Sequence, residues 1–387
     1  MSHFSSRMEQ VQSPIIPVVG ELIRQHPGTI SLGQGVVFYG PPPQALARVS
    51  DCFQDSENHK YKAVQGIAPL LEAIAHKLLT ENQISVNPHE QIVVTAGSNM
   101  GFVNALLAIT NPGDEIILQT PYYFNHEMAI ATASCTAVCV PTDDHYQLRL
   151  DAIEAAITDR TRAIVTISPN NPTGAVYPSE SLEAVNRMCQ EHHLYHISDE
   201  AYEYFTYGSA QHVSPATFDQ GGEHTISLFS LSKAYGFAGW RIGYMVIPVH
   251  LMTAVQKIQD TILICPPVVS QYAALGALEA GRNYCQPCID EIAQVHDQVL
   301  RSLDQIRDFC VIPNPDGAFY VFLKLNTELK AMTVVERLIK EHGVAVIPGD
   351  TFGLTEGCYL RIAHGALTAE QTINGMERFV EGLRSVI

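Results

Sequence analysis

Lys233 stands in a sequence setting that suits amine chemistry. Residues 226–229 form an apolar run typical of a buried strand, which breaks into Ser230-Leu231-Ser232-Lys233, and Arg241 follows eight residues beyond the lysine. Desolvation and a neighbouring cation lower the pKa of an amine, and the neutral amine can form an imine with a carbonyl compound. The Ser230 hydroxyl and the Arg241 guanidinium are groups that can hold a phosphate. This combination indicates pyridoxal phosphate as a cofactor.

The Ser-x-x-Lys spacing has two other interpretations. It also occurs in serine acyl-transfer enzymes, but the Ser-Asp-Asn and Lys-Thr-Gly motifs that accompany it there are missing from this chain. Taken alone, the segment could equally be a surface loop, so the rest of the chain has to decide.

Chemically useful side chains follow several short apolar strands. We expect strands at residues 91–95, 115–119, 136–140, 163–167, 194–197 and 225–229, separated by helical patterns. Buried strands that alternate with helices indicate a mostly parallel sheet in a three-layer α/β domain, and such sheets bind ligands at the carboxyl ends of their strands. Five of the strands are followed there by polar or aromatic residues, namely Gly97 and Ser98, Tyr123, Asn171, Asp199 and Tyr202, and Lys233. We therefore predict one shared site.

The turn Ala96-Gly97-Ser98-Asn99 leads from a strand directly into an apolar helix. This arrangement offers free backbone N–H groups and the positive end of a helix dipole to a phosphate. No G-x-G-x-x-G or G-x-x-x-x-G-K motif is present, which disfavours dinucleotides and nucleoside triphosphates.

The pattern changes towards the C-terminus. Helices continue from residue 247 to about residue 308, followed by strands expected at 318–325, 344–347 and 359–363, a helix at 333–342, and a last helix with a Thr368/Gln371 capping box. These elements indicate a smaller α+β domain, and we expect the N-terminal segment to pack with it. The predicted division is a large domain at 45–275 and a small domain made of 1–44 and 276–387.

Composition restricts the partners and the location. A net charge of -17 argues against nucleic acid or an anionic membrane as a partner. No apolar run is long enough to cross a bilayer, and the start MSHFSSRMEQ does not resemble a signal peptide, so we expect a cytoplasmic protein. Nine cysteines fit reduced thiols better than a disulfide framework. The pair Cys285/Cys288, placed between helical stretches, and the histidines at 192, 193 and 196 are interpreted as structural, and no metal is expected.

Five motifs, in this order, resemble those of the class I/II aminotransferases among the fold type I pyridoxal-phosphate enzymes: SPNNPTG, SDEAY, SLSKAYGFAGWRIGY, PGDTFG and CYLRIAHG. The resemblance covers nearly the whole chain. It implies a large domain with a mostly parallel seven-stranded sheet flanked by helices, a smaller α+β domain, and transfer of an amino group from an L-amino acid to a 2-oxo acid. The stretches LGQGVVFYGPPP, PYYFN and YEYF further resemble the aromatic and methionine aminotransferases of plants and cyanobacteria.

The resemblance also implies roles for individual residues. Lys233 would carry the cofactor as an imine and move the substrate proton, and Asp199 would keep the pyridine nitrogen protonated. Tyr202 and Asn171 would bind the phenolic oxygen of the cofactor. The remaining roles are the phosphate site (Gly97, Ser98, Asn99, Ser230, Arg241 and, from the neighbouring subunit of a homodimer, Tyr61), stacking on the ring (Tyr123) and the substrate carboxylate (Gly35, Asn171, Arg361).

The substrate is indicated less directly. The loop after Gly35 reads Val36-Val37-Phe38-Tyr39, which favours an aromatic amino acid or methionine over aspartate. An aspartate or broad-range aminotransferase is an alternative, as is a β-lyase or an aminocyclopropane-carboxylate-synthase-like enzyme. The effector domain of a transcription regulator is disfavoured, because the segment before Tyr61 is too broken by Pro and Gly to hold a helix-turn-helix.

Overall fold

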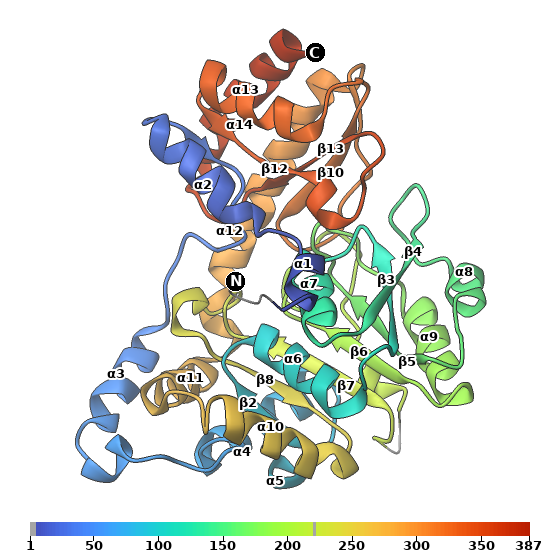
Figure 1. Cartoon of the computed structure of the whole chain (residues 1–387). Helices are drawn as coiled ribbons and strands as arrows, with labels where there is room; N and C mark the ends of the chain where they lie inside the picture. Colours follow the sequence, from blue (N-terminus) through green and yellow to red (C-terminus); the bar gives the residue numbers. More distant parts are fainter. Residues whose placement is uncertain (1–4, 220–221) are drawn as a thin grey trace, which may run out of the picture.

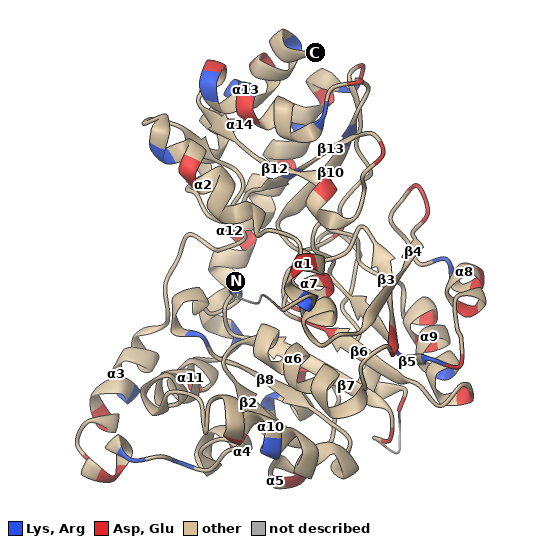
Figure 2. Ribbon diagram, in the orientation of Figure 1, with Lys and Arg blue, Asp and Glu red and all other residues tan. Residues whose placement is uncertain are grey.

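The computed structural model describes residues 5–219 and 222–387 of the chain. The chain forms two lobes, with the N-terminal helix α2 (Ile15–Gln25) lying in the same lobe as the C-terminal helices α13 (Ala331–His342) and α14 (Ala369–Val386) (Figure 1). The long helix α12 (Arg282–Leu303) runs from one lobe into the other. Acidic residues are spread over both lobes (Figure 2).

The larger lobe is built on a seven-stranded sheet with the strand order β2-β8-β7-β6-β5-β3-β4. Strand β8 is antiparallel to both of its neighbours, and the other adjacent pairs are parallel. The prediction of a mostly parallel seven-stranded sheet is therefore confirmed. The strands are β2 (Ile92–Thr95), β3 (Glu115–Thr120), β4 (Thr136–Pro141), β5 (Thr161–Ile167), β6 (Tyr195–Asp199), β7 (Thr225–Ser230) and β8 (Gly243–Val246).

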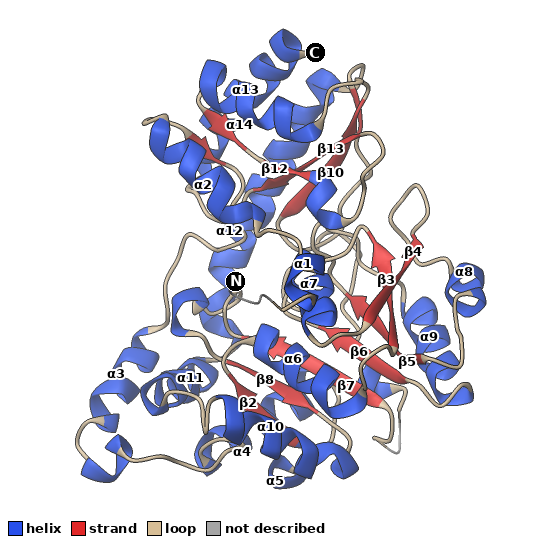
Figure 3. Ribbon diagram, viewed as in Figure 1, coloured by secondary structure: helices blue, strands red, loops and turns tan. Residues whose placement is uncertain are grey.

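Helices cover both faces of this sheet (Figure 3). Successive side chains of a strand point to opposite faces, so Leu228 packs with residues of α6, α7 and α10, whereas its neighbour Phe229 packs with residues of α4 and α11. The helices of this lobe are α3 (Pro43–Cys52), α4 (Ala68–Glu81), α5 (Pro88–Gln91), α6 (Ser98–Ile109), α7 (Phe124–Thr132), α8 (Leu150–Ala155), α9 (Ser179–Glu191), α10 (Met252–Ile262) and α11 (Val268–Ala280), and the short α1 (Arg7–Gln10) lies against α7.

The smaller lobe holds a four-stranded antiparallel sheet and one short parallel pair. The sheet has the order β12 (Ile347–Pro348), β13 (Cys358–Ala363), β10 (Tyr320–Leu325), β9 (Cys310–Val311). The N-terminal β1 (Ile30–Ser31) pairs in parallel with β11 (Val344–Ala345). The division at residues 44/45 and 275/276 stays a prediction.

Two expectations from the sequence are wrong in detail. Residues 344–347 do not form one strand, because β11 and β12 belong to different sheets on either side of Val346. Cys285 and Cys288 do not lie between helices but inside the first turns of α12, on either side of Pro287. All nine cysteines are free thiols, and burial raises the pKa of both members of this pair.

Candidate active site

A cavity of about 140 Å³ lies where the strands of the large sheet end. Its walls include nine of the residues predicted from the sequence. Four belong to the expected phosphate side: Ser98, Asn99, Ser230 and Arg241. Five belong to the expected ring side: Tyr123, Asn171, Asp199, Tyr202 and Lys233. Parallel strands bring their carboxyl ends to one edge, which is why residues spread over more than a hundred positions meet here.

The amine of Lys233 projects into this cavity from the turn after β7. Its Nζ donates a hydrogen bond to the Gly35 carbonyl at 2.5 Å and lies 5.5 Å from the ring centroid of Tyr202. Burial lowers the pKa of the amine to about 8, the Arg361 and Arg241 cations act in the same direction, and the Asp199 carboxylate opposes them. In a fraction of the molecules, the Lys233 amine is therefore neutral and nucleophilic at physiological pH.

Asp199 is the last residue of β6 and is almost completely buried. One carboxylate oxygen accepts the Ala201 backbone N–H at 3.1 Å, and the other lies 3.1 Å from His126 Nε2. The His126 ring stacks on Phe102 with a centroid separation of 4.0 Å, and neither ring nitrogen makes an aligned hydrogen bond within the described part of the chain. The Ala201 N–H and the stacked His126 ring therefore flank the Asp199 carboxylate at the cavity wall.

The phosphate side is built around the N-terminus of α6. Gly97 caps this helix with φ +80°, and a Cβ there would lie 2.6 Å from Arg241 Nη2, so glycine both adopts the backbone conformation and admits the arginine. The backbone of Arg241 adopts the left-handed helical conformation, and its Nη1 donates a hydrogen bond to the Ala238 carbonyl at 2.9 Å. Backbone N–H groups, the Ser230 hydroxyl and a guanidinium form a set of donors that fits a phosphate dianion.

Arg361 lies behind the cavity wall and reaches it through Asn171. Its Nη1 donates to Asn171 Oδ1 at 2.9 Å and its Nη2 to the Gly33 carbonyl at 2.8 Å, while Nε has no hydrogen-bond partner among the described residues. Only 2% of Arg361 is exposed. A buried guanidinium with spare donor capacity is suited to a carboxylate.

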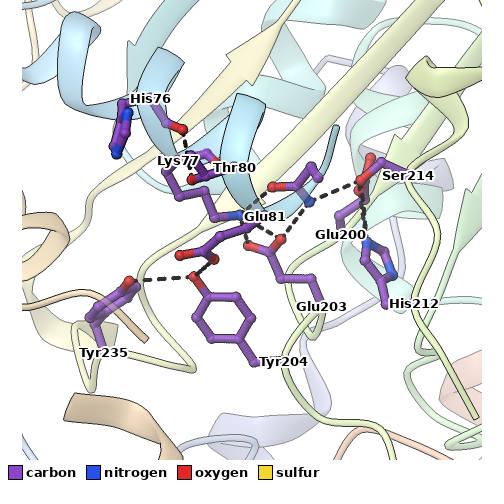
Figure 4. A network of polar contacts seen from close by, with 11 residues as sticks. His76, Lys77, Thr80, Glu81, Glu200, Glu203, Tyr204, His212, Ser214 and Tyr235 are labelled. Carbon is purple, nitrogen blue, oxygen red and sulfur yellow. Dashed lines mark hydrogen bonds and ion pairs between the residues drawn. The ribbon is translucent and has the colours of Figure 1, made fainter. Parts of the chain in front are cut away.

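Glu200 and Glu203, which directly follow Asp199 and Tyr202 in the chain, belong to a separate network of polar contacts (Figure 4). Glu203 receives the Lys77 ammonium of α4 at 2.5 Å and the Asn82 amide at 2.8 Å. Lys77 also lies 4.9 Å from the centroid of the Phe229 ring on β7. One buried ammonium thus connects α4 to both chain segments that supply the catalytic side of the cavity.

We expect Lys77→Met to lower the free energy of unfolding by about 3 kcal/mol, because it leaves the Glu203 carboxylate buried without its counter-ion. The double variant Lys77→Met/Glu203→Leu should recover most of that loss. Urea unfolding of the apoprotein, followed by the fluorescence of the single tryptophan Trp240, measures both. A single variant as stable as the wild type would show that this ion pair is solvated in solution.

Tyr61 is not brought to the cavity of its own chain. Its side chain is 79% exposed and lines a separate surface hollow with Phe53, Cys265 and Pro266. Gly35 lies next to the site, where its backbone carbonyl accepts the hydrogen bond from Lys233.

The sequence interpretation missed two side chains that contact the site residues. His126 lies three positions after Tyr123 in α7, and Tyr320 begins β10 and pairs its hydroxyl with that of Tyr202 at 2.7 Å. For His126 the strand exit PYYFNH carried a signal, because one helical turn brings residues three apart to the same side. For Tyr320 no local signal existed, since the contact depends on how the two lobes meet.

The fold indicates a class of enzyme. So does the grouping of a buried lysine with a carboxylate, phosphate-type donors and an arginine. The sequence model of the family "Aminotransferase class I and II" matches residues 27–379, and the chain belongs to this family. It is an aminotransferase.

The relatives are all named as aminotransferases, but their names give different substrates. The chain is 36% identical to the probable aspartate/prephenate aminotransferase of Aquifex aeolicus, covering 84% of each protein. It is 31% identical to the aromatic aminotransferase ISS1 of Arabidopsis thaliana, covering 99% of this chain and 97% of that protein. A solved structure of a Thermus thermophilus aspartate aminotransferase mutant superposes with a TM-score of 0.91 at 32% identity, over 99% of this chain and all of the other.

Proposed function

We propose that the cavity binds pyridoxal phosphate and that the enzyme moves the amino group of an aromatic amino acid or methionine to a 2-oxo acid. The observation that carries the cofactor assignment is the joint placement of Lys233, Asp199 and the Arg241/α6 phosphate side around one cavity. When bound, the cofactor serves as the electron sink for cleavage of the substrate Cα–H bond.

The residues around the cavity would then divide the tasks of the reaction among them. The Lys233 amine would hold the cofactor through its carbonyl carbon and, once free, would move the proton from the substrate Cα to that carbon. Asp199 would keep the ring nitrogen protonated, and Tyr202 and Asn171 would hydrogen-bond the phenolic oxygen. Arg361 grips the substrate α-carboxylate with paired donors, which fixes the Cα–H bond relative to the lysine.

The substrate preference rests on where the cations are. The described lining of the cavity contains only Lys233 and Arg241 as cations, and Arg361 stands behind Asn171. All three have tasks in the common part of the reaction. A second carboxylate would have no cation from this chain, and burying it unpaired costs several kcal/mol, whereas burying an aromatic side chain gains about 1.5–3 kcal/mol.

We therefore expect kcat/KM for phenylalanine and methionine to exceed that for aspartate by at least about tenfold, with breadth across Phe, Tyr, Trp and Met. Half-reaction rates of the cofactor-loaded enzyme with each amino acid measure this. Omitting the 2-oxo acid in steady-state assays is the control, because a lyase would still turn over and an aminotransferase would stop.

Aspartate is the second candidate, and the name of the Aquifex relative favours it. It requires a cation from outside the described lining, such as Lys62 of a second subunit. A higher kcat/KM for aspartate than for phenylalanine and methionine would show that such a cation exists and that the apolar reading of the pocket is wrong.

The functional unit is proposed to be a homodimer with shared sites. The support is the exposed position of Tyr61 beside Phe53, Pro266 and Pro267, an apolar surface from which the phenol could reach a second copy. The nine free thiols fit a reducing compartment, and we propose the cytoplasm.

Tyr61→Phe should weaken cofactor retention about tenfold and leave the dimer intact, because it removes one hydroxyl contact to the partner's phosphate. Cofactor titration and sedimentation velocity together measure the two effects. A wild-type protein that sediments as a monomer at assay concentrations would contradict the shared site.

A further inference from the structure

Arg361, Asn171, Tyr202 and Tyr320 form a closed ring of contacts between the smaller lobe and the cavity. Arg361 Nη1 donates to Asn171 Oδ1 at 2.9 Å, Asn171 Nδ2 donates to the Tyr202 hydroxyl at 3.4 Å, and the Tyr202 and Tyr320 hydroxyls are 2.7 Å apart. The guanidinium carbon of Arg361 lies 4.6 Å from the centroid of the Tyr320 ring, which closes the ring. All four residues are buried.

The directions of the hydrogen bonds in this ring follow from which atoms can donate. Arginine has only donors, so Asn171 presents its oxygen to Arg361 and its amide nitrogen to Tyr202. Either hydroxyl of the Tyr202/Tyr320 pair can be the donor, and Tyr202 is the one hydrogen-bond partner of the Tyr320 hydroxyl among the described residues. We assign Tyr320 as the donor, because its buried hydrogen then has an acceptor. With both acceptor sites of the Tyr202 oxygen filled, the Tyr202 hydrogen is left to point into the cavity that this residue lines.

The backbone around Tyr320 holds it in this place. It is the first residue of β10 and pairs with Ala363 of β13, two residues from Arg361. A Cβ on Gly35 would lie 2.3 Å from the Tyr320 oxygen, and one on Gly174 would lie 2.7 Å from the Tyr320 carbonyl oxygen. Glycine at both positions leaves the room that this tyrosine occupies.

We propose that Tyr320 is a positioning residue with two effects: its hydroxyl directs the Tyr202 hydrogen towards the cofactor's phenolic oxygen, and its ring supports the Arg361 guanidinium that binds the substrate carboxylate. One side chain of the smaller lobe thereby couples the cofactor contact to the substrate contact. This inference rests on the proposed function and extends it to a residue outside the cavity lining.

Two substitutions separate the effects. Tyr320→Phe removes the hydroxyl and keeps the ring, whereas Tyr320→Leu removes both. The matched control is Tyr146→Phe, which deletes the hydroxyl of a buried tyrosine that contacts the Phe322 carbonyl, away from the cavity. The readouts are the pH midpoint of the visible absorbance of the bound cofactor, and kcat and KM with phenylalanine measured separately.

Tyr320→Phe should raise the pH midpoint by about 0.5–1 unit, because a misdirected donor stabilises the anionic oxygen less, and should lower kcat roughly threefold to tenfold with little change in KM. Tyr320→Leu should in addition raise KM about tenfold through the loss of the cation–π contact. Tyr146→Phe should match the wild type.

The outcomes distinguish this inference from the proposed function. A wild type that neither develops the cofactor absorbance nor transaminates would contradict the proposed function itself. A wild type that does both, with Tyr320→Phe indistinguishable from Tyr146→Phe in midpoint and kcat, would overturn the role of the hydroxyl. Equal KM values for the Phe and Leu variants would overturn the support of Arg361 by the ring.

Discussion

Lys233→Ala is expected to lower kcat/KM on the order of 10⁶-fold, the loss typical of removing a nucleophile that also transfers the proton. The variant should still bind pyridoxal phosphate, because Ser98, Ser230 and Arg241, the residues proposed to contact the phosphate, remain in the cavity wall. Single-turnover assays measure the first effect and equilibrium dialysis the second. Lys257→Ala is the control, since this lysine lies on α10 and does not line the cavity. Retention of substantial activity by Lys233→Ala would remove the lysine from the mechanism.

The pH dependence of cofactor attachment follows from the same amine. Its pKa of about 8 in the folded protein, set mainly by burial and also by Arg361, means that the reactive neutral form grows as the pH rises and is complete above about pH 9. The attachment rate of the apoenzyme should therefore rise with a midpoint near pH 8. An unperturbed lysine would place the midpoint more than two units higher, near 10.4.

Asp199→Asn is expected to keep the fold and lower kcat roughly a hundredfold to a thousandfold, about 3–4 kcal/mol of transition-state stabilisation. An amide has the size of the carboxylate but no charge to hold a proton on the ring nitrogen. His126 loses its acidic neighbour at the same time, so His126→Gln is the comparison: it should cost less, because the carboxylate itself remains.

Unfolding measurements on the Asp199→Asn apoprotein should give a stability close to that of the wild type, which assigns the loss to chemistry. An Asp199→Asn enzyme within twofold of wild-type kcat would show that Asp199 does not face the ring nitrogen.

Most of the cavity could be predicted from the order of elements along the chain. Ser98, Tyr123, Asn171, Asp199 and Lys233 each follow an apolar strand, and parallel strands place such residues at one edge without further information. Their roles, and the part of Arg361, came from motifs that resemble a known family.

What the sequence could not supply are contacts set by packing between elements. His126 lies beside Asp199 because α7 packs against α6 with the His126 side facing it, which stacks the His126 ring on Phe102. Tyr320 meets Tyr202 only because β10 of the smaller lobe docks beside the turn after β6. The single strand expected at 344–347 is wrong for a similar reason. β11 pairs with β1 in one sheet and β12 pairs with β13 in another. Hydrophobic patterning indicates that a residue is buried but not which neighbour it receives.

Lys233 is the residue that we propose to carry the cofactor. Borohydride reduction of the cofactor-loaded enzyme, followed by proteolysis and mass spectrometry of the peptides, tests it most directly, because reduction makes the attachment permanent. We expect one modified peptide per chain, with the added mass on Lys233. Modification of a different lysine, or an unmodified Lys233 peptide in a fully loaded and reduced sample, would contradict it.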